Sequence, residues 1–190
     1  MKVDLSVIIP VYGDKDLICG CLAQFGRVQD VEKVVVVNGP DDGAGSLLAE
    51  RQRDDPMLHV HRCRPGRAAA MNCGARHARG DTLLFLHCDC ILPACGVARI
   101  RESIQNGAVG GFFRIRHDCN MLGYRLLSPL INYRSRTTSV PFGDQGIFVR
   151  RIVFEELGGY REMPILEDYE FAKRLARRAK LTAIEEPLTA

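Results

Sequence analysis

The chain has 190 residues, of which 46% are hydrophobic and 26% are charged, a balance that is ordinary for one globular domain with a sizeable core. The formal net charge of +3 suits anionic small molecules, but it falls short of the clustered positive charge that nucleic-acid binding requires. No apolar segment approaches the roughly 18 residues of a membrane span, so we expect no transmembrane helix in this chain.

Strand and helix patterns alternate along the first half of the chain. Short runs of β-branched and other apolar residues predict strands at 5–11, 31–37, 58–63 and 82–86. Helices are predicted after Gly13 and over residues 45–53 and 67–79. This alternation is typical of the α/β class, with a mostly parallel central sheet flanked by helices on both faces.

The second half is mixed in character. It predicts strands at 110–117 and 147–149, a helix at 121–133 interrupted by Pro129, and a helix at 152–157 that ends at two glycines. A last helix opens at Glu167 and has Phe171, Leu175 and Ala179 as its apolar stripe. Its basic residues, within 173–180, are predicted to form a solvated face. No linker separates the halves, so we expect a single domain over residues 1–190.

Cysteine usage indicates a reducing compartment. The chain has eight cysteines, and Met1 is followed almost directly by a predicted strand, with no secretory leader pattern. The C-x-C pairs Cys19/Cys21 and Cys88/Cys90 lack the usual zinc spacing. We therefore expect reduced thiols in a cytoplasmic protein.

Polar residues follow three of the predicted parallel strands, namely Tyr12, Asn38 and Asp89. The carboxyl ends of such strands meet at one edge of an open α/β sheet, where ligands bind. A carboxylate there, Asp89, can bind a divalent cation together with a substrate phosphate. The alternative is that Asp89 caps a turn or the next helix. No G-x-G-x-x-G follows the first strand and no P-loop is present, which disfavours the folds that depend on those loops.

Six short motifs, in order along nearly the whole chain, resemble the family-2 inverting glycosyltransferases of the GT-A fold. They are LSVIIPVYGD (5–14), VVVVNG (34–39), GRAAAMNCGARHARGD (66–81), FLHCDC (85–90), GDQG (143–146) and ILEDYEF (165–171). The combination is most similar to a bacterial subgroup of transferases associated with radical-SAM proteins and arsenosugar biosynthesis. The resemblance implies a nucleotide-sugar donor, such as a UDP-sugar, bound by residues 1–93. It implies that residues 94–190 bind the acceptor and supply the catalytic base.

The resemblance also implies roles for individual residues. The substrate-binding residues would be Pro10, Val11, Tyr12, Asn38, Arg67, Asn72, Asp89, Gln145 and Gly146. Pro10, Val11 and Tyr12 would border the base, and Asn38 stands where relatives usually carry an aspartate that contacts uracil. Arg67 and Asn72 would lie near the diphosphate, consistent with a helix start that can receive an anion.

The implied chemistry uses two acidic positions. Asp89 would bind Mn²⁺ or Mg²⁺, which neutralises the departing diphosphate. Asp168, next to Glu167, would be the general base that takes the proton of an acceptor hydroxyl. Two acids in the first turn of a helix are also a common stabilising feature, and from the residues alone that alternative stays open. Cys90 replaces an acid or hydroxyl residue of relatives, and a thiol is a poor ligand for these cations.

Two other functions remain as alternatives. Sugar-phosphate nucleotidyltransferases have a similar sheet, but they carry a glycine-rich basic loop after the first strand, where this chain has only Gly13. A non-catalytic nucleotide-binding or scaffold protein stays open because of the altered metal motif, although the acid at Asp168 is intact. Relatives commonly carry a segment that can touch a membrane, so the resemblance allows peripheral contact with the inner face of a membrane. The mildly basic charge predicts no nucleic-acid partner. The sugar and the acceptor are left open.

Overall fold

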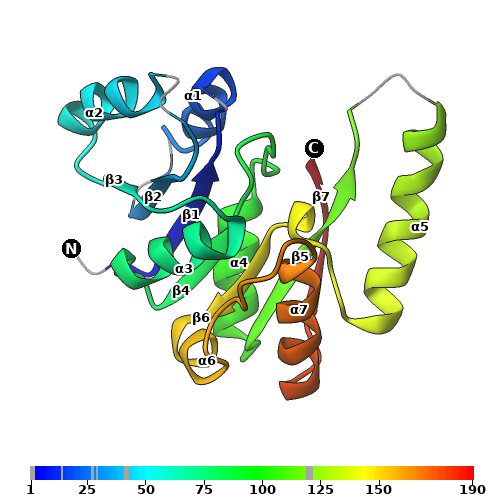
Figure 1. Ribbon diagram of the computed structural model, residues 1–190. Coiled ribbons are helices and arrows are strands. Elements are labelled where there is room, and N and C mark those ends of the chain that lie inside the picture. Colours follow the sequence, from blue (N-terminus) through cyan, green and yellow to red (C-terminus); the bar gives the residue numbers. More distant parts are fainter. Residues whose placement is uncertain (1–2, 14, 27, 29, 41–42, 119–121) are drawn as a thin grey trace.

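The computed structural model describes the chain apart from residues 1–2, 14, 27, 29, 41–42 and 119–121 (Figure 1). Its described strands form one sheet in the order β3-β2-β1-β4-β6-β5-β7. The strands are β1 (Leu5–Val11), β2 (Val31–Val37), β3 (Leu58–Arg62), β4 (Thr82–Phe85), β5 (Gly110–Arg116), β6 (Ile147–Arg150) and β7 (Thr182–Thr189). Strands β1 to β4 run parallel, whereas β6 is antiparallel to both β4 and β5. The predicted sheet, mostly parallel with a mixed second half, is confirmed.

Helices cover both faces of the sheet, which explains why the central strands are apolar on both sides. They are α1 (Lys15–Ala23), α2 (Ala44–Asp54), α3 (Arg67–His77), α4 (Gly96–Gln105), α5 (Leu122–Thr138), α6 (Arg151–Glu156) and α7 (Glu167–Arg178), with a 3₁₀ turn, η1 (Gly143–Gln145). Val7 and Ile9 of β1 pack towards α1, α2 and α4, whereas Ile8 packs towards α3, α6 and α7. Figure 1 shows α5 standing beside β5 at the far end of the sheet.

Helix α5 differs from its prediction because it continues through Pro129 to Thr138. Proline removes one helical hydrogen bond, but tertiary contacts on both sides of it keep the helix in place. Asn132 makes two hydrogen bonds to the backbone of Ile115 in β5, at 2.8 and 2.9 Å. Ser128 hydrogen-bonds His117 at 2.8 Å. The predicted start at residue 121 lies outside the described residues.

The last helix also differs from its prediction. It ends at Arg178, so Ala179 lies beyond it and the buried stripe runs through Phe171, Ala172 and Leu175. Arg174 does not belong to a solvated face. Its guanidinium donates to the carbonyl oxygens of Leu157 and Gly159 at 2.6 and 2.7 Å, and it also pairs with Glu170. These carbonyls follow the end of α6, where the helix leaves acceptors without partners.

Candidate active site

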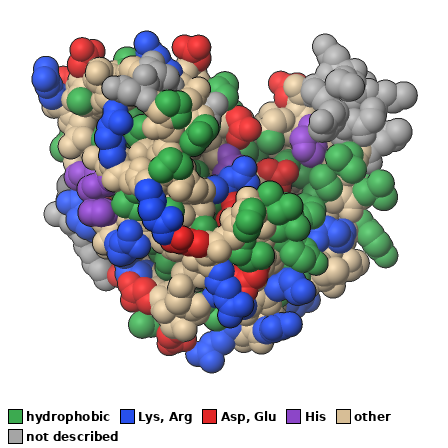
Figure 2. All heavy atoms as spheres, viewed as in Figure 1, with side chains coloured by type: hydrophobic (Ala, Val, Ile, Leu, Met, Phe, Trp, Pro, Cys, Tyr) green, Lys and Arg blue, Asp and Glu red, His purple; other side chains and the backbone are tan. Residues whose placement is uncertain are grey.

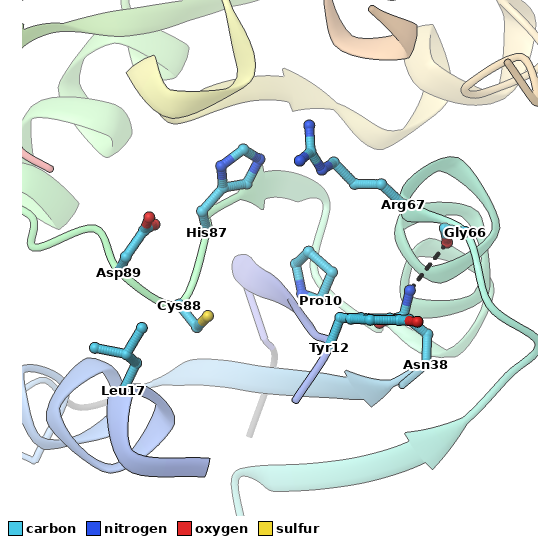
Figure 3. Close-up of a pocket in the computed structure, with 9 residues that line it drawn as sticks. All are labelled: Pro10, Tyr12, Leu17, Asn38, Gly66, Arg67, His87, Cys88 and Asp89. Carbon is cyan, nitrogen blue, oxygen red and sulfur yellow. Dashed lines mark hydrogen bonds between the residues drawn. The ribbon is translucent and has the colours of Figure 1, made fainter. Parts of the chain in front are cut away.

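A pocket of about 420 Å³ lies at the carboxyl ends of β1, β2 and β4, beside the start of α3 (Figure 3). It is lined by Pro10, Tyr12, Leu17, Asn38, Gly66, Arg67, His87, Cys88 and Asp89. In the space-filling view, this face of the molecule is hollowed between the part that carries α1 and α2 and the part that carries α5 (Figure 2). The strand-end residues Tyr12, Asn38 and Asp89 therefore do converge on one space, together with Pro10 and Arg67.

The first wall of the pocket is built on the end of β2. Asn38 is buried, and its Nδ2 donates to the carbonyl of Gly66 at 3.2 Å (Figure 3). Gly66 has a φ of +129°, a backbone conformation that residues other than glycine rarely adopt. Asn38 Oδ1 has no hydrogen-bond partner within the described residues. The amide thus fixes the loop before α3 and leaves an acceptor atom for a ligand, while the exposed ring of Tyr12 lies nearby.

The opposite wall carries His87 at its base. Figure 3 shows His87, Arg67 and Asp89 directed into the same space. His87 Nε2 is buried without a partner in the described part of the chain. Burial, and then the charge of Arg67, lower the pKa of His87, so the imidazole is neutral at pH 7. Sequence reasoning did not select His87, although its place directly after the apolar run of β4 was a usable signal.

The two acids of α7 lie next to this wall. Asp168 accepts hydrogen bonds from the backbone N–H groups of Gly143 and Tyr169, at 2.5 and 2.7 Å. A methyl group on Gly143 would lie 2.7 Å from Asp168 Oδ2 and 3.1 Å from His87 Nε2, so only glycine permits this approach. Glu167 is buried, and its Oε1 lies 3.4 Å from Arg67 Nη1. Arg67 therefore links the pocket to the helix that carries both acids.

The buried thiol of Cys90 contacts the carboxylate of Asp89 and the backbone of Asp144. Cys90 Sγ lies 3.5 Å from Asp89 Oδ1 and 3.8 Å from the backbone carbonyl oxygen of Asp144, which are the two acceptors within reach of its single proton. Burial raises the pKa of Cys90 far above its usual value, so the thiol keeps its proton. Burial also raises the pKa of Asp144; His117 opposes this effect, and the negative charge of Asp168 adds to it. The carboxylates of Asp89, Asp144 and Asp168 are thus close enough to influence one another electrostatically.

The residues of this cleft meet the needs of a divalent cation only in part. Within the described residues, no three His, Cys, Asp or Glu side chains already converge on one point. Asp89 offers an exposed carboxylate in the pocket, and one of its oxygens accepts from Cys90. This fits a cation that takes one carboxylate from the protein and its other oxygens from a diphosphate and water. Cys90 itself does not fit, because it stays protonated.

Four of the substrate-binding residues implied by the resemblance lie outside the lining of the pocket. Val11 is fully buried in the core. The amide of Asn72 accepts from the backbone N–H of Tyr160 and donates to its carbonyl, at 2.9 and 2.8 Å. Gln145 is buried and hydrogen-bonds Ser135 and the backbone of β5. Gly146 adopts a φ of +60° in close contact with core side chains. These residues build the frame around the site.

Known proteins resemble this chain in both sequence and fold. Residues 6–158 match the model of Glycosyl transferase family 2. The uncharacterized glycosyltransferase YfnE of Bacillus subtilis is 32% identical over 115 residues, which are 57% of this chain and 29% of the relative. A mannosyltransferase from Pyrobaculum calidifontis, solved with GDP-Man and Mn²⁺, matches with a TM-score of 0.75 at 20% identity, over 100% of this chain and 57% of that one.

A second solved structure has a similar fold. TarS of S. aureus in complex with UDP-GlcNAc matches with a TM-score of 0.77 at 17% identity, over 98% of this chain and 58% of that one. The chain therefore spans less than two thirds of each of these proteins. No helix among the described residues combines the length and the apolarity that crossing a membrane requires. Since the family model covers more than half of the 190 residues, the chain belongs to glycosyl transferase family 2.

Proposed function

We propose that this domain transfers a sugar, a hexose, from a nucleotide-diphosphate donor to an acceptor hydroxyl with inversion, and that the donor is a UDP-sugar. The observation that carries the proposal is the pocket in which Asn38, Arg67 and Asp89 meet, with Asp168 at its border. Its volume of about 420 Å³ lies within the usual range for small-molecule sites. The nucleotide-sugars bound in the two similar structures, GDP-Man and UDP-GlcNAc, support the donor class.

Donor binding is assigned to the first half of the chain. Asn38 Oδ1, which lacks a protein partner within the described residues, accepts a hydrogen bond from a ring N–H of the base. Tyr12 offers an exposed aromatic face beside it. The first N–H groups of α3 and the guanidinium of Arg67 receive the diphosphate, because helix N-termini and arginines both favour phosphate groups.

The metal is assigned to Asp89. A bound Mn²⁺ or Mg²⁺ would neutralise the charge that develops on the departing diphosphate. Asp89 would supply a protein carboxylate, and the thiol of Cys90 orients that carboxylate by donating to Oδ1. The Mn²⁺ that accompanies GDP-Man in the mannosyltransferase structure supports the use of a divalent cation in this fold.

Asp168 is assigned as the general base. The N–H groups of Gly143 and Tyr169 fix the orientation of its carboxylate, which leaves it placed to take a proton from an acceptor hydroxyl. Direct attack by that hydroxyl inverts the anomeric carbon and needs no covalent nucleophile. Glu167 supports the base indirectly, since Arg67 balances its buried charge.

We also propose a narrower setting for the protein. The motif combination at 66–81, 85–90 and 143–146 supports membership of the bacterial subgroup associated with radical-SAM proteins and arsenosugar biosynthesis. That setting is cytoplasmic, with contact at the inner face of a membrane. The chain acts as one domain, in which residues 1–93 bind the donor and residues 94–190 bind the acceptor and supply the base.

The experiment combines a nucleotide-sugar panel with one variant. Thermal melting with and without Mn²⁺ identifies the donor, because a ligand at about 100 times its Kd stabilises the native state by roughly 2.7 kcal/mol. Asp168→Asn should abolish transfer and donor hydrolysis while leaving the donor-induced shift in place. Asp54→Asn, an exposed position on α2, is the matched control. Full activity in Asp168→Asn would refute the base assignment, and no shift with any nucleoside diphosphate would favour the scaffold function.

A further inference from the structure

Helix α5 buries polar side chains and exposes apolar ones. Ser128, Asn132 and Ser135 recur at helical spacing on the side that faces the protein, and each of them is buried. Their hydrogen bonds reach distant elements: Asn132 bonds the backbone of Ile115, and Ser135 Oγ donates to Gln145 Oε1 at 2.7 Å. A helix at the surface of a protein in water normally has the opposite arrangement, with its apolar stripe against the core.

The outer face of α5 consists of Leu127, Leu130 and Tyr133, which are 42%, 65% and 72% exposed. A single exposed leucine is common on a protein surface, but three large apolar side chains on one helix face mark a site of contact with another molecule or phase. Figure 2 shows hydrophobic side chains gathered on the side of the molecule where α5 lies. The buried polar stripe and the exposed apolar face together indicate a surface that is covered when the protein works.

The charge of this segment selects the kind of partner. Residues 122–143 include three arginines and no aspartate or glutamate. Helical spacing places Arg134 and Arg136 on the two sides of the outer face of α5. Arg136 lies 3.3 Å from Glu185, but that acid also faces Arg114, so positive charge remains in excess. An apolar stripe flanked by arginines matches an anionic lipid bilayer, whereas two copies of this face would bring like charges together.

We propose that the outer face of α5 docks on an anionic lipid bilayer, with the helix lying in the plane of the interface. The leucines enter the boundary between headgroups and acyl chains, and the amphipathic ring of Tyr133 suits the headgroup level. The long side chains of the flanking arginines reach lipid phosphates while their stems cover apolar surface. This inference rests on the membrane setting proposed above and assigns that contact to one surface of the domain.

The docking surface is continuous with the surroundings of the proposed base. The guanidinium of Arg134 lies 4.0 Å from the centroid of the Phe142 ring. Phe142 packs against Tyr169, the residue after the proposed base, with ring centroids 5.7 Å apart. Ile165 and Leu166, directly before α7, are also exposed, at 71% and 50%. Docking through α5 therefore brings the acceptor side of the site to the bilayer, which suits an acceptor hydroxyl presented at a membrane surface.

Vesicle flotation of the full chain tests the docking surface. Vesicles of phosphatidylcholine alone are compared with an equal mixture of phosphatidylcholine and phosphatidylglycerol, at low and at high salt. We expect binding to the mixed vesicles that weakens as the salt concentration rises, and little binding to the neutral vesicles. Leu130→Gln/Tyr133→Gln should weaken binding at least roughly tenfold, because two large apolar side chains no longer leave water. Ile152→Gln, at a 60% exposed position on α6, is the matched control and should bind as the wild type does.

The substituted side chains are exposed and glutamine is a good helix former, so both variants should keep the wild-type melting temperature. Donor hydrolysis without vesicles should also be unchanged in the double variant, which separates membrane docking from sugar transfer. A wild-type protein that does not bind the mixed vesicles would overturn the docking and leave the proposed transfer intact. Equal binding by the double variant, or binding that ignores lipid charge, would overturn it as well. A dimer in sedimentation that the double variant abolishes would assign this face to a second copy of the chain instead.

Discussion

Gly143 lies where a single added methyl group perturbs the proposed base directly. In Gly143→Ala the new Cβ would stand 2.7 Å from Asp168 Oδ2 and 3.1 Å from both Asp168 Cβ and His87 Nε2. Carbon and oxygen atoms do not approach that closely, so η1 or the acid must move. The hydrogen bond from Gly143 N–H to Asp168, which is 2.5 Å long in the wild-type protein, would be disturbed by the same shift. The substitution therefore displaces the carboxylate without removing it.

Two magnitudes follow from this contact. Overpacking a tightly packed site costs about 1–3 kcal/mol of stability. A displacement of a catalytic group by about 1 Å can reduce the rate roughly 100-fold. We therefore expect kcat to fall by about two orders of magnitude. KM for the donor should change less, because Asn38, Arg67 and Asp89, which we assign to the donor, are not among the atoms nearest to the new methyl group. The melting temperature should fall modestly.

The assay is steady-state transfer or donor hydrolysis, with the melting temperature measured in parallel. Gly20→Ala is the matched control, because a methyl group there meets nothing within 4 Å and the position is inside α1. It should gain up to about 1 kcal/mol of stability and keep full activity. If Gly143→Ala keeps the wild-type kcat, Asp168 is not the base, or its position does not depend on η1.

Two further predictions concern stability. Asn72→Ala leaves the buried backbone N–H and C=O of Tyr160 without the hydrogen bonds to Asn72. Urea unfolding should therefore show that the free energy of unfolding falls by roughly 1–3 kcal/mol, while KM for the donor is unchanged. A raised KM with unchanged stability would instead make Asn72 a substrate ligand. Burial alone would raise the pKa of Glu32, but hydrogen bonds from Ser6 and Arg79 outweigh it and lower that pKa below its usual value. Unfolding therefore takes up a proton, so this contribution to stability is present above about pH 4.3 and is lost as the pH falls through the folded pKa. The midpoint of urea unfolding should vary less with pH across that range in Glu32→Gln than in the wild-type protein. The same pH dependence in both proteins would contradict this assignment.

The strand-end residues were predictable from the sequence because parallel strands place their carboxyl ends at one edge. That rule alone predicts that Tyr12, Asn38 and Asp89 lie together. It could not separate the lining residues from their neighbours in the same motifs. Asn72 is such a case, since its partner Tyr160 lies 88 residues away in the chain. A polar side chain in a short motif can bind a ligand or a distant backbone, and local sequence does not distinguish these uses.

The second half was less predictable because its key contacts are all distant in sequence. Nothing local indicates that β6 enters between β4 and β5, or that Asn132 anchors α5 on β5 past Pro129. Arg174 shows the same limit, since its helical spacing is that of a solvated face and only the turn after α6 gives it buried partners. Periodicity reports which face of an element is apolar, but it does not report which carbonyls a long side chain reaches.

The position of β6 has a consequence for how the chain folds during synthesis. Strand β4 pairs with β1 on one side and with β6 on the other, and β6 is made only after β5 and α5. Until then, the emerging N-terminal half carries β4 as an open edge with unpaired backbone groups, which is the feature that promotes aggregation. Late closure by a non-local strand also raises the contact order, so formation of the complete sheet is expected to be the slow step. Strand β6, which pairs with both β4 and β5, is thus expected to end the exposure of the β4 edge in the nascent protein.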